Sequence, residues 1–208
     1  MWYNSLKNQL DRLPGESAHI DMIPYRNVSS SYKIDEKNTK QSAVLCLLKQ
    51  VDKELYGLLI QRQSDGGKHS GQIAFPGGKK DQTDKNLEQT ALRETYEEVG
   101  IEQHNIEILG RLTPVYIPVS HFFVQPFIGI LKQEQDLTLS TREVKEAFWF
   151  NIKDLLSDEC KTKRHIKNHK GITMKNIPCF MLNDKVVWGA TSLILNELKQ
   201  LFINSGLK

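Results

Sequence analysis

The sequence predicts an α/β fold in which helices pack on a mixed β-sheet. Apolar runs with the composition of strands recur between residues 41 and 150. Helical spacing is clearest in three places, one near each end of the chain and one in the middle. Strands that do not alternate regularly with helices favour a mixed sheet over a repeated βαβ array.

The first elements are a helix and a strand pair. Residues 1–15 read as a short amphipathic helix ending near Pro14, and residues 15–40 are polar and predict a loop with one short strand. Residues 41–50 and 56–63 are apolar runs separated by the charged break VDKE, which is typical of two strands with a tight connection. QIAFPGG follows as a third strand that stops at the glycines.

A helix is predicted next, over residues 86–99. Asn86 followed by Gln89 forms a plausible capping box, and Gly100 can adopt the left-handed conformation after the last turn. Its expected core stripe is Leu92, Thr95, Tyr96 and Val99.

The second half supplies further strands and a terminal helix. IEILGRL, VYIPV and FFVQPFIGIL are strand candidates between residues 106 and 131. EAFWFNIKDLL reads as a strand running into a short helix, and residues 191–202 as a terminal amphipathic helix. The basic run KTKRHIKNHK, residues 161–170, is interpreted as a solvated loop that could steer an anionic substrate.

Composition narrows the class of protein. The 208 residues suffice for one well-cored domain, and 39% apolar and 25% charged residues are typical of a globular protein. No apolar run is long enough to span a bilayer, the N-terminus is a poor signal peptide, and a net charge of +3 is too mild to favour nucleic-acid binding. Cys46, Cys160 and Cys179 have neither disulfide nor zinc spacing, so we expect a cytoplasmic protein with reduced thiols.

Three acids on the central helix carry the functional signal. Glu94, Glu97 and Glu98 fall on one helical face, where Arg93 can orient Glu97 across one turn. A solvated face is the bland interpretation. The alternative is a seat for a hard divalent cation, because clustered carboxylates beside the open backbone of Gly77-Gly78 supply the oxygen ligands that Mg²⁺ prefers.

The glycine pair and the segment RETYEEVGI, residues 93–101, resemble the Nudix box. The resemblance implies a Nudix-type α/β/α sandwich and Mg²⁺- or Mn²⁺-dependent hydrolysis of a nucleotide. It also implies metal ligation by Glu94, Glu97, Glu98 and the carbonyl of Gly78, and catalytic roles for Arg93, Glu97 and Glu98. The early box glutamate is absent: Lys85 holds its spacing, beside Asp84.

Residues 58–78 are similar to the pattern that marks coenzyme A pyrophosphatases within the family, with the same length. The differences are Ile60, Gln63 and Gly67, the last replacing an Arg beside Lys68 and His69. The resemblance continues to residue 200 and implies a Nudix domain over 36–208 with a helical extension over 1–35. Nudix domains often pair, which suggests a homodimer.

The implied reaction cleaves the pyrophosphate of coenzyme A into a 4′-phosphopantetheine species and adenosine 3′,5′-bisphosphate. Alternatives are hydrolysis of ADP-ribose, a dinucleotide or a nucleoside triphosphate, and a non-catalytic nucleotide sensor. Arg62, Lys68, His69 and Gly77 are the expected substrate contacts. The general base is open between Glu97 and Glu143, and Trp149 and Trp188 are expected in the core.

Overall fold

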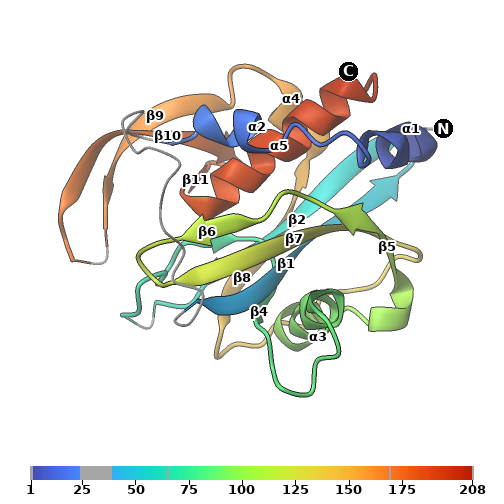
Figure 1. The fold of residues 1–208 in the computed structure, drawn as a ribbon, viewed down its shortest axis with the longest axis horizontal. Coiled ribbons are helices and arrows are strands. Elements are labelled where there is room, and N and C mark those ends of the chain that lie inside the picture. The colour runs from blue at the N-terminus through green and yellow to red at the C-terminus, as the bar shows by residue number, and fades with distance from the viewer. Residues whose placement is uncertain (1, 24–38, 65, 169, 208) are drawn as a thin grey trace.

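A mixed β-sheet forms the centre of the fold (Figure 1). The computed structural model describes residues 2–23, 39–64, 66–168 and 170–207. The sheet's eight strands are β1 (Lys40–Val51), β2 (Glu54–Arg62), β3 (Ile73–Ala74), β4 (Gly77–Lys79), β5 (Ile106–Arg111), β6 (Val115–Ile117), β7 (Phe122–Leu131) and β8 (Val144–Asn151). Their order is β3-β2-β1-β7-β5, with β4 on β1, β6 on β7 and β8 on β2. Only β1 and β7 pair in parallel among these, so the predicted mixed sheet is confirmed.

Two helical layers cover the two faces of this sheet. Successive side chains of a strand point to opposite faces, and along β1 Leu45 and Leu47 enter one core cluster while Cys46 and Leu48 enter the other. Helix α3 (Leu87–Val99) packs on the first cluster, and α5 (Ala190–Asn204) packs on the second. Figure 1 shows the sheet between these two helices. The predicted α/β/α sandwich is therefore confirmed.

Helix α3 begins and ends where the sequence predicts. The side chain of Asn86 accepts a hydrogen bond from the backbone N–H of Gln89 (2.8 Å), and Gly100 ends the helix with φ 75°. The expected core stripe is partly wrong. Tyr96 is 46% exposed. The buried positions of the helix are instead Thr90, Ala91, Thr95, Glu98 and Val99.

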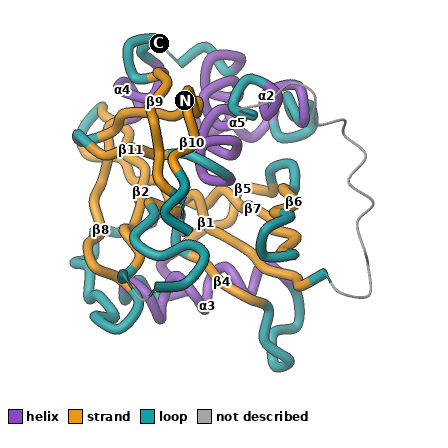
Figure 2. Tube along the Cα trace, turned by 90° about the vertical axis from the view of Figure 1, so that its left-hand side faces the viewer, coloured by secondary structure: helices purple, strands orange, loops and turns teal. Residues whose placement is uncertain are grey.

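A second, three-stranded sheet lies beside α5, on the side of the main sheet opposite α3 (Figure 2). It contains β9 (Lys161–Lys167), β10 (Thr173–Leu182) and β11 (Lys185–Val187), and follows the short helix α4 (Ile152–Leu156). The prediction of a loop over residues 161–170 is wrong for most of this run, because β9 pairs with β10. Neither β10 nor β11 was predicted from the sequence.

The N-terminal segment packs on α5 through two helices, α1 (Trp2–Gln9) and α2 (Glu16–Ile20). The first helix ends earlier than predicted, and α2 replaces the start of the expected loop. Residues 24–38 of that loop, and the predicted domain boundary at residue 35, lie outside the described residues. No helix in the described part of the chain has the length and apolar character needed to cross a membrane.

Glu197 of α5 fixes this N-terminal segment. Its buried carboxylate meets His19 Nε2 at 3.3 Å and accepts hydrogen bonds from the N–H of Gly15 (3.2 Å) and the hydroxyl of Thr113 (2.6 Å). Burial raises the pKa of Glu197, but the bonds from His19 and Thr113 outweigh it and lower this pKa below its usual value. The carboxylate thus ties α2, α5 and the chain after β5 together.

Glu197→Ala should lower the free energy of unfolding by about 3 kcal/mol, because it leaves several buried donors without an acceptor. Urea denaturation measures the change, with the exposed Glu88→Ala on α3 as the control. A Glu197→Ala protein as stable as wild type would contradict the role of this network.

Candidate active site

The predicted site residues gather around a cavity of about 670 Å³. Its lining combines the segment 67–79, the face of α3 that carries Glu94, the start of α5, and parts of β6, β7, β10 and the loop before β8. Of the predicted site residues, those in its wall are Arg62, Lys68, His69, Gly77, Gly78, Glu94 and Glu143. Arg93, Glu97 and Glu98 are not in the wall.

Glu98 lies directly behind this wall. Its side chain is 1% exposed, and its two carboxylate oxygens accept hydrogen bonds from Arg62 Nη1 (3.2 Å) and the backbone N–H of Gly77 (2.8 Å). Burial raises the pKa of Glu98 to about 7, although the bond from Gly77 opposes the shift. Burying an ionised carboxylate here costs free energy. Glu98 is therefore not part of a solvent-exposed helix face, and that interpretation is excluded for it.

The backbone of Gly77 and Gly78 approaches its neighbours too closely for any side chain. At Gly78 a Cβ would lie 2.3 Å from Oε2 of Glu94, and at Gly77, where φ is 151°, it would lie 2.3 Å from the carbonyl oxygen of Ala43. The glycines do not end the preceding strand as predicted; they form β4, which pairs with β1. The lack of side chains brings the Glu94 carboxylate against the backbone.

Arg93 organises the acidic groups of this helix. Its Nη1 contacts Oε1 of Glu94 and Oε2 of Glu97, each at 2.9 Å, which confirms the predicted pairing with Glu97. The Glu97 side chain is 51% exposed, whereas that of Glu94 is 14% exposed. Burial raises the pKa of Glu94, and the bond from Arg93 opposes this shift.

Asp84 is a site residue that the sequence analysis left without a role. Its carboxylate forms a bidentate pair with Nε and Nη2 of Arg93 (both 2.9 Å) and also accepts hydrogen bonds from the N–H of Asp81 and the hydroxyl of Thr90. The Arg93 bond holds the pKa of Asp84 well below its usual value. Asp84 therefore fixes the guanidinium that also contacts Glu94 and Glu97. The sequence signal that could have identified Asp84 is its position beside Lys85, which holds the spacing of the early box glutamate.

Arg93→Met should lower the free energy of unfolding by about 3 kcal/mol at pH 7, because it leaves the buried Asp84 carboxylate unpaired. Pairing lowers the folded-state pKa of Asp84, so its stabilisation is present above about pH 4 and is lost as pH falls towards the lowered value. Urea denaturation should therefore show the difference from wild type shrinking between pH 5 and pH 3.

The double variant Arg93→Met/Asp84→Asn is the matched control, because it removes both charges of the pair. It should recover part of the lost stability. If the loss of stability in the double variant equals the sum of the losses in Arg93→Met and Asp84→Asn, the two side chains are not coupled.

Glu143 reaches the cavity from the loop before β8. Burial is the main cause of the raised pKa values of Glu94 and Glu98, and the negative charge of Glu143 raises both further. The loop is fixed by Gln63, whose N–H donates to the carbonyl of Glu143 and whose side chain donates to the carbonyl of Thr141, both at 2.8 Å.

The three differences from the coenzyme A pattern occupy different environments. Ile60 is fully buried in the core under α3, and Gln63 holds the Glu143 loop. Only Gly67 lies in the cavity wall, beside Lys68. A single one of the three differences thus faces the space where a substrate can lie.

Lys68 and His69 join two loops at the mouth of the cavity. Lys68 Nζ donates to the carbonyl of Val119 (2.6 Å), and the His69 ring lies between Gln72 Oε1 (3.3 Å) and Ser120 Oγ (3.1 Å). These side chains therefore also have a structural part in holding the segment 67–72 against the loop after β6.

The two tryptophans differ from each other. Trp149 is partly buried and packs against the core cluster under α3, as expected, with Lys49 Nζ 4.6 Å from its ring. Trp188 is also partly buried, but it lies in the cavity wall and belongs to neither core cluster, so its expected place in the core is wrong.

The donors around Gly78 suit a hard divalent cation. Within the described ranges, no three acidic, histidine or cysteine side chains are already arranged to hold a metal ion. Arg93 contacts the carboxylates of Glu94 and Glu97. The Glu94 carboxylate lies against Gly78, and the Glu98 carboxylate accepts a hydrogen bond from the N–H of Gly77, so both carboxylates adjoin the glycine pair. Carboxylate and carbonyl oxygens are the ligands that Mg²⁺ and Mn²⁺ take in proteins, and a cation would relieve the cost of burying these charges.

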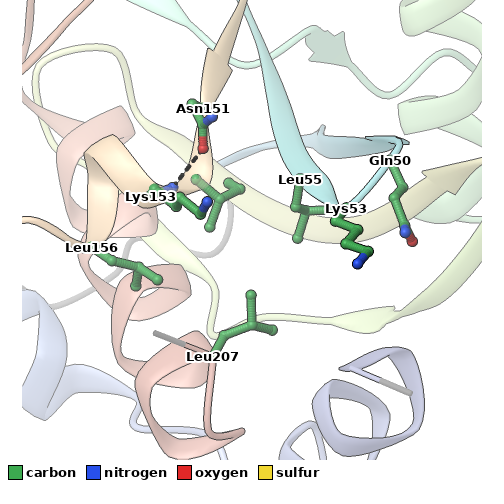
Figure 3. Close-up of a pocket in the computed structure, with 8 residues that line it drawn as sticks. Gln50, Lys53, Leu55, Asn151, Lys153, Leu156 and Leu207 are labelled. Atoms are coloured by element: carbon green, nitrogen blue, oxygen red, sulfur yellow. Dashed lines mark hydrogen bonds between the residues drawn. The ribbon is translucent and has the colours of Figure 1, made fainter.

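A second cavity is too small for a nucleotide. It measures about 80 Å³ and lies between the β1–β2 turn and α4 (Figure 3). There the Asn151 side chain caps α4 by accepting from the N–H of Lys153 (2.8 Å) and donates to Glu54 (2.8 Å). These contacts give Asn151 a structural role.

Comparison with known proteins identifies the protein family. Residues 39–172 match the NUDIX domain, and the chain belongs to the Nudix hydrolase family. It is 36% identical over 169 residues to the Nudix hydrolase NudL of Enterobacter sp. (strain 638), covering 79% of this chain and 83% of that protein. It is also 34% identical over 158 residues to the human mitochondrial coenzyme A diphosphatase NUDT8, covering 76% and 66%.

A solved structure supports the fold. The MutT/nudix family protein from Enterococcus faecalis aligns with a TM-score of 0.53 and 21% identity, over 95% of this chain and 73% of that one. Nudix hydrolases generally use divalent metal ions.

Proposed function

We propose that this chain hydrolyses the diphosphate bond of coenzyme A or its derivatives, giving a 4′-phosphopantetheine species and adenosine 3′,5′-bisphosphate. The observation that carries the proposal is one cavity whose wall contains the box residues Glu94 and Gly78, the cations Arg62 and Lys68, and an apolar surface. A diphosphate flanked by two large groups could contact all three kinds of surface. Similarity to a named coenzyme A diphosphatase supports the choice of substrate.

Glu94, Glu98 and the carbonyl of Gly78 would hold Mg²⁺ or Mn²⁺. When bound, such an ion neutralises phosphate oxygens and lowers the pKa of water. Arg62 and Lys68 are cations of the wall that would bind phosphate oxygens.

The two candidates for the general base are Glu97 and Glu143. Glu143 lines the cavity, whereas Glu97 is exposed outside it and paired with Arg93. We therefore assign to Glu143 the acceptance of a proton from the attacking water. Arg93 then acts as a positioning residue through its contact with Glu94, and Glu97 as one through its contact with Arg93.

The test is a substrate panel with Mg²⁺ or Mn²⁺, read by product chromatography. Coenzyme A should give the highest kcat/KM and the two products named above. Faster cleavage of ADP-ribose, a dinucleotide or a nucleoside triphosphate would assign another Nudix hydrolase activity. Binding without turnover of any compound would indicate a nucleotide sensor.

Cellular location and assembly stay predictions. The described cysteines are all buried free thiols, which supports the proposed cytoplasmic location. The proposed homodimer rests on resemblance, and size-exclusion chromatography with light scattering tests it.

A further inference from the structure

The cavity extends beyond the segment that matches the NUDIX domain. The match covers residues 39–172, but the wall continues over Met174 of β10, Trp188 after β11, and Gly189–Thr191 with Ile194 at the start of α5. The C-terminal part of the chain therefore completes the cavity with side chains of its own.

This added wall is apolar. Met174, Trp188 and Ile194 share it with Ile117 of β6 and Val119 of the following loop. Val119 is 57% exposed and adds accessible apolar surface to this wall. The surface is continuous with the polar wall at Glu94 and Arg62, so one ligand can contact both.

Two polar side chains of the cavity wall are engaged within the protein. The Thr191 hydroxyl donates to the carbonyl of Ile73 (3.0 Å), and Lys68 Nζ donates to that of Val119 (2.6 Å). A nucleobase buried here would need partners for its polar edges, and leaving them unpaired costs free energy. An aliphatic chain has no such requirement and gains from burial.

We infer that the wall of Ile117, Val119, Met174, Trp188 and Ile194 binds an apolar acyl group of the substrate, at the end away from the diphosphate. This inference rests on the proposed function, because it assumes a coenzyme A thioester. The chain would then select acylated coenzyme A over the free thiol, and Trp188 and Met174 would determine that selectivity.

The test compares free, acetyl- and octanoyl-coenzyme A. Because burial of methylene groups is favourable, kcat/KM for the octanoyl thioester should be at least about tenfold higher than for free coenzyme A. Trp188→Ala should reduce this ratio to below about threefold, with a smaller reduction for Met174→Ala. Trp188→Phe should retain most of the ratio, because it keeps an aromatic surface.

Trp149→Phe is the matched control, because Trp149 lies outside the cavity wall. It should leave the ratio unchanged. Melting temperatures of all variants check folding. A ratio near one in the wild type, or an equal loss on all three compounds in Trp188→Ala, would overturn the inference while leaving the diphosphatase proposal intact.

Calorimetry on the metal-chelated protein separates the two proposals. If no compound is hydrolysed, the proposed function fails, yet tighter binding of octanoyl- than of free coenzyme A, lost in Trp188→Ala, would still support the apolar wall. Equal affinities, or no binding, would overturn it.

Discussion

Glu98→Gln should lower kcat for the preferred substrate by at least about a hundredfold at saturating Mg²⁺, the scale expected when a charge-stabilising catalytic contact is lost. The amide keeps the shape of the side chain and can still accept from Gly77, but it cannot supply a second negative charge beside Glu94. Steady-state kinetics over a range of Mg²⁺ concentrations measure the effect. Wild-type turnover in this variant would end the assignment of Glu98 as a metal ligand.

Folding of this variant should be preserved. Because burial raises the pKa of Glu98 to about 7, its ionisation destabilises the metal-free protein as pH rises from about 4.5 through 7. The chelated Glu98→Gln protein should therefore melt no lower than wild type at pH 8. Glu88→Gln, an exposed change on the same helix, is the control and should alter neither turnover nor melting temperature appreciably.

Glu143→Gln should lower kcat by at least about a hundredfold with KM within about threefold of wild type, because a positioned general base contributes this much to the chemical step. Glu97→Gln makes the same chemical change outside the cavity and should cost less than about tenfold. The opposite ranking of these two variants would assign the base to the helix instead of the loop.

Local chemistry made the central sheet and α3 predictable. Apolar runs separated by VDKE marked β1 and β2, and Asn86 and Gly100 marked the ends of the helix. The run 161–167 was misread because lysines and arginines are poor strand markers. It is nevertheless an edge strand, where charged side chains remain in water and discourage pairing with other chains.

Other features depend on contacts between distant residues. The strand β10 includes Pro178, and its pairing with β9 is irregular between Met174 and Ile177, where Asn176 has φ 55°, so no regular alternation marks it. The burial of Glu98 depends on Arg62, which lies thirty-six residues earlier in the chain. Spacing on a helix identifies which carboxylates are neighbours; it does not show which of them the rest of the fold covers.

The position of α5 has a practical consequence for work on fragments. Expressing residues 39–172 alone would remove α5 and the N-terminal helices together, and with them the cover of the sheet face that carries Cys46, Leu48 and Ile128. Such a fragment would expose a large hydrophobic surface and should aggregate or self-associate. Boundaries drawn from sequence matching alone would therefore give an unsuitable sample for crystallisation or screening.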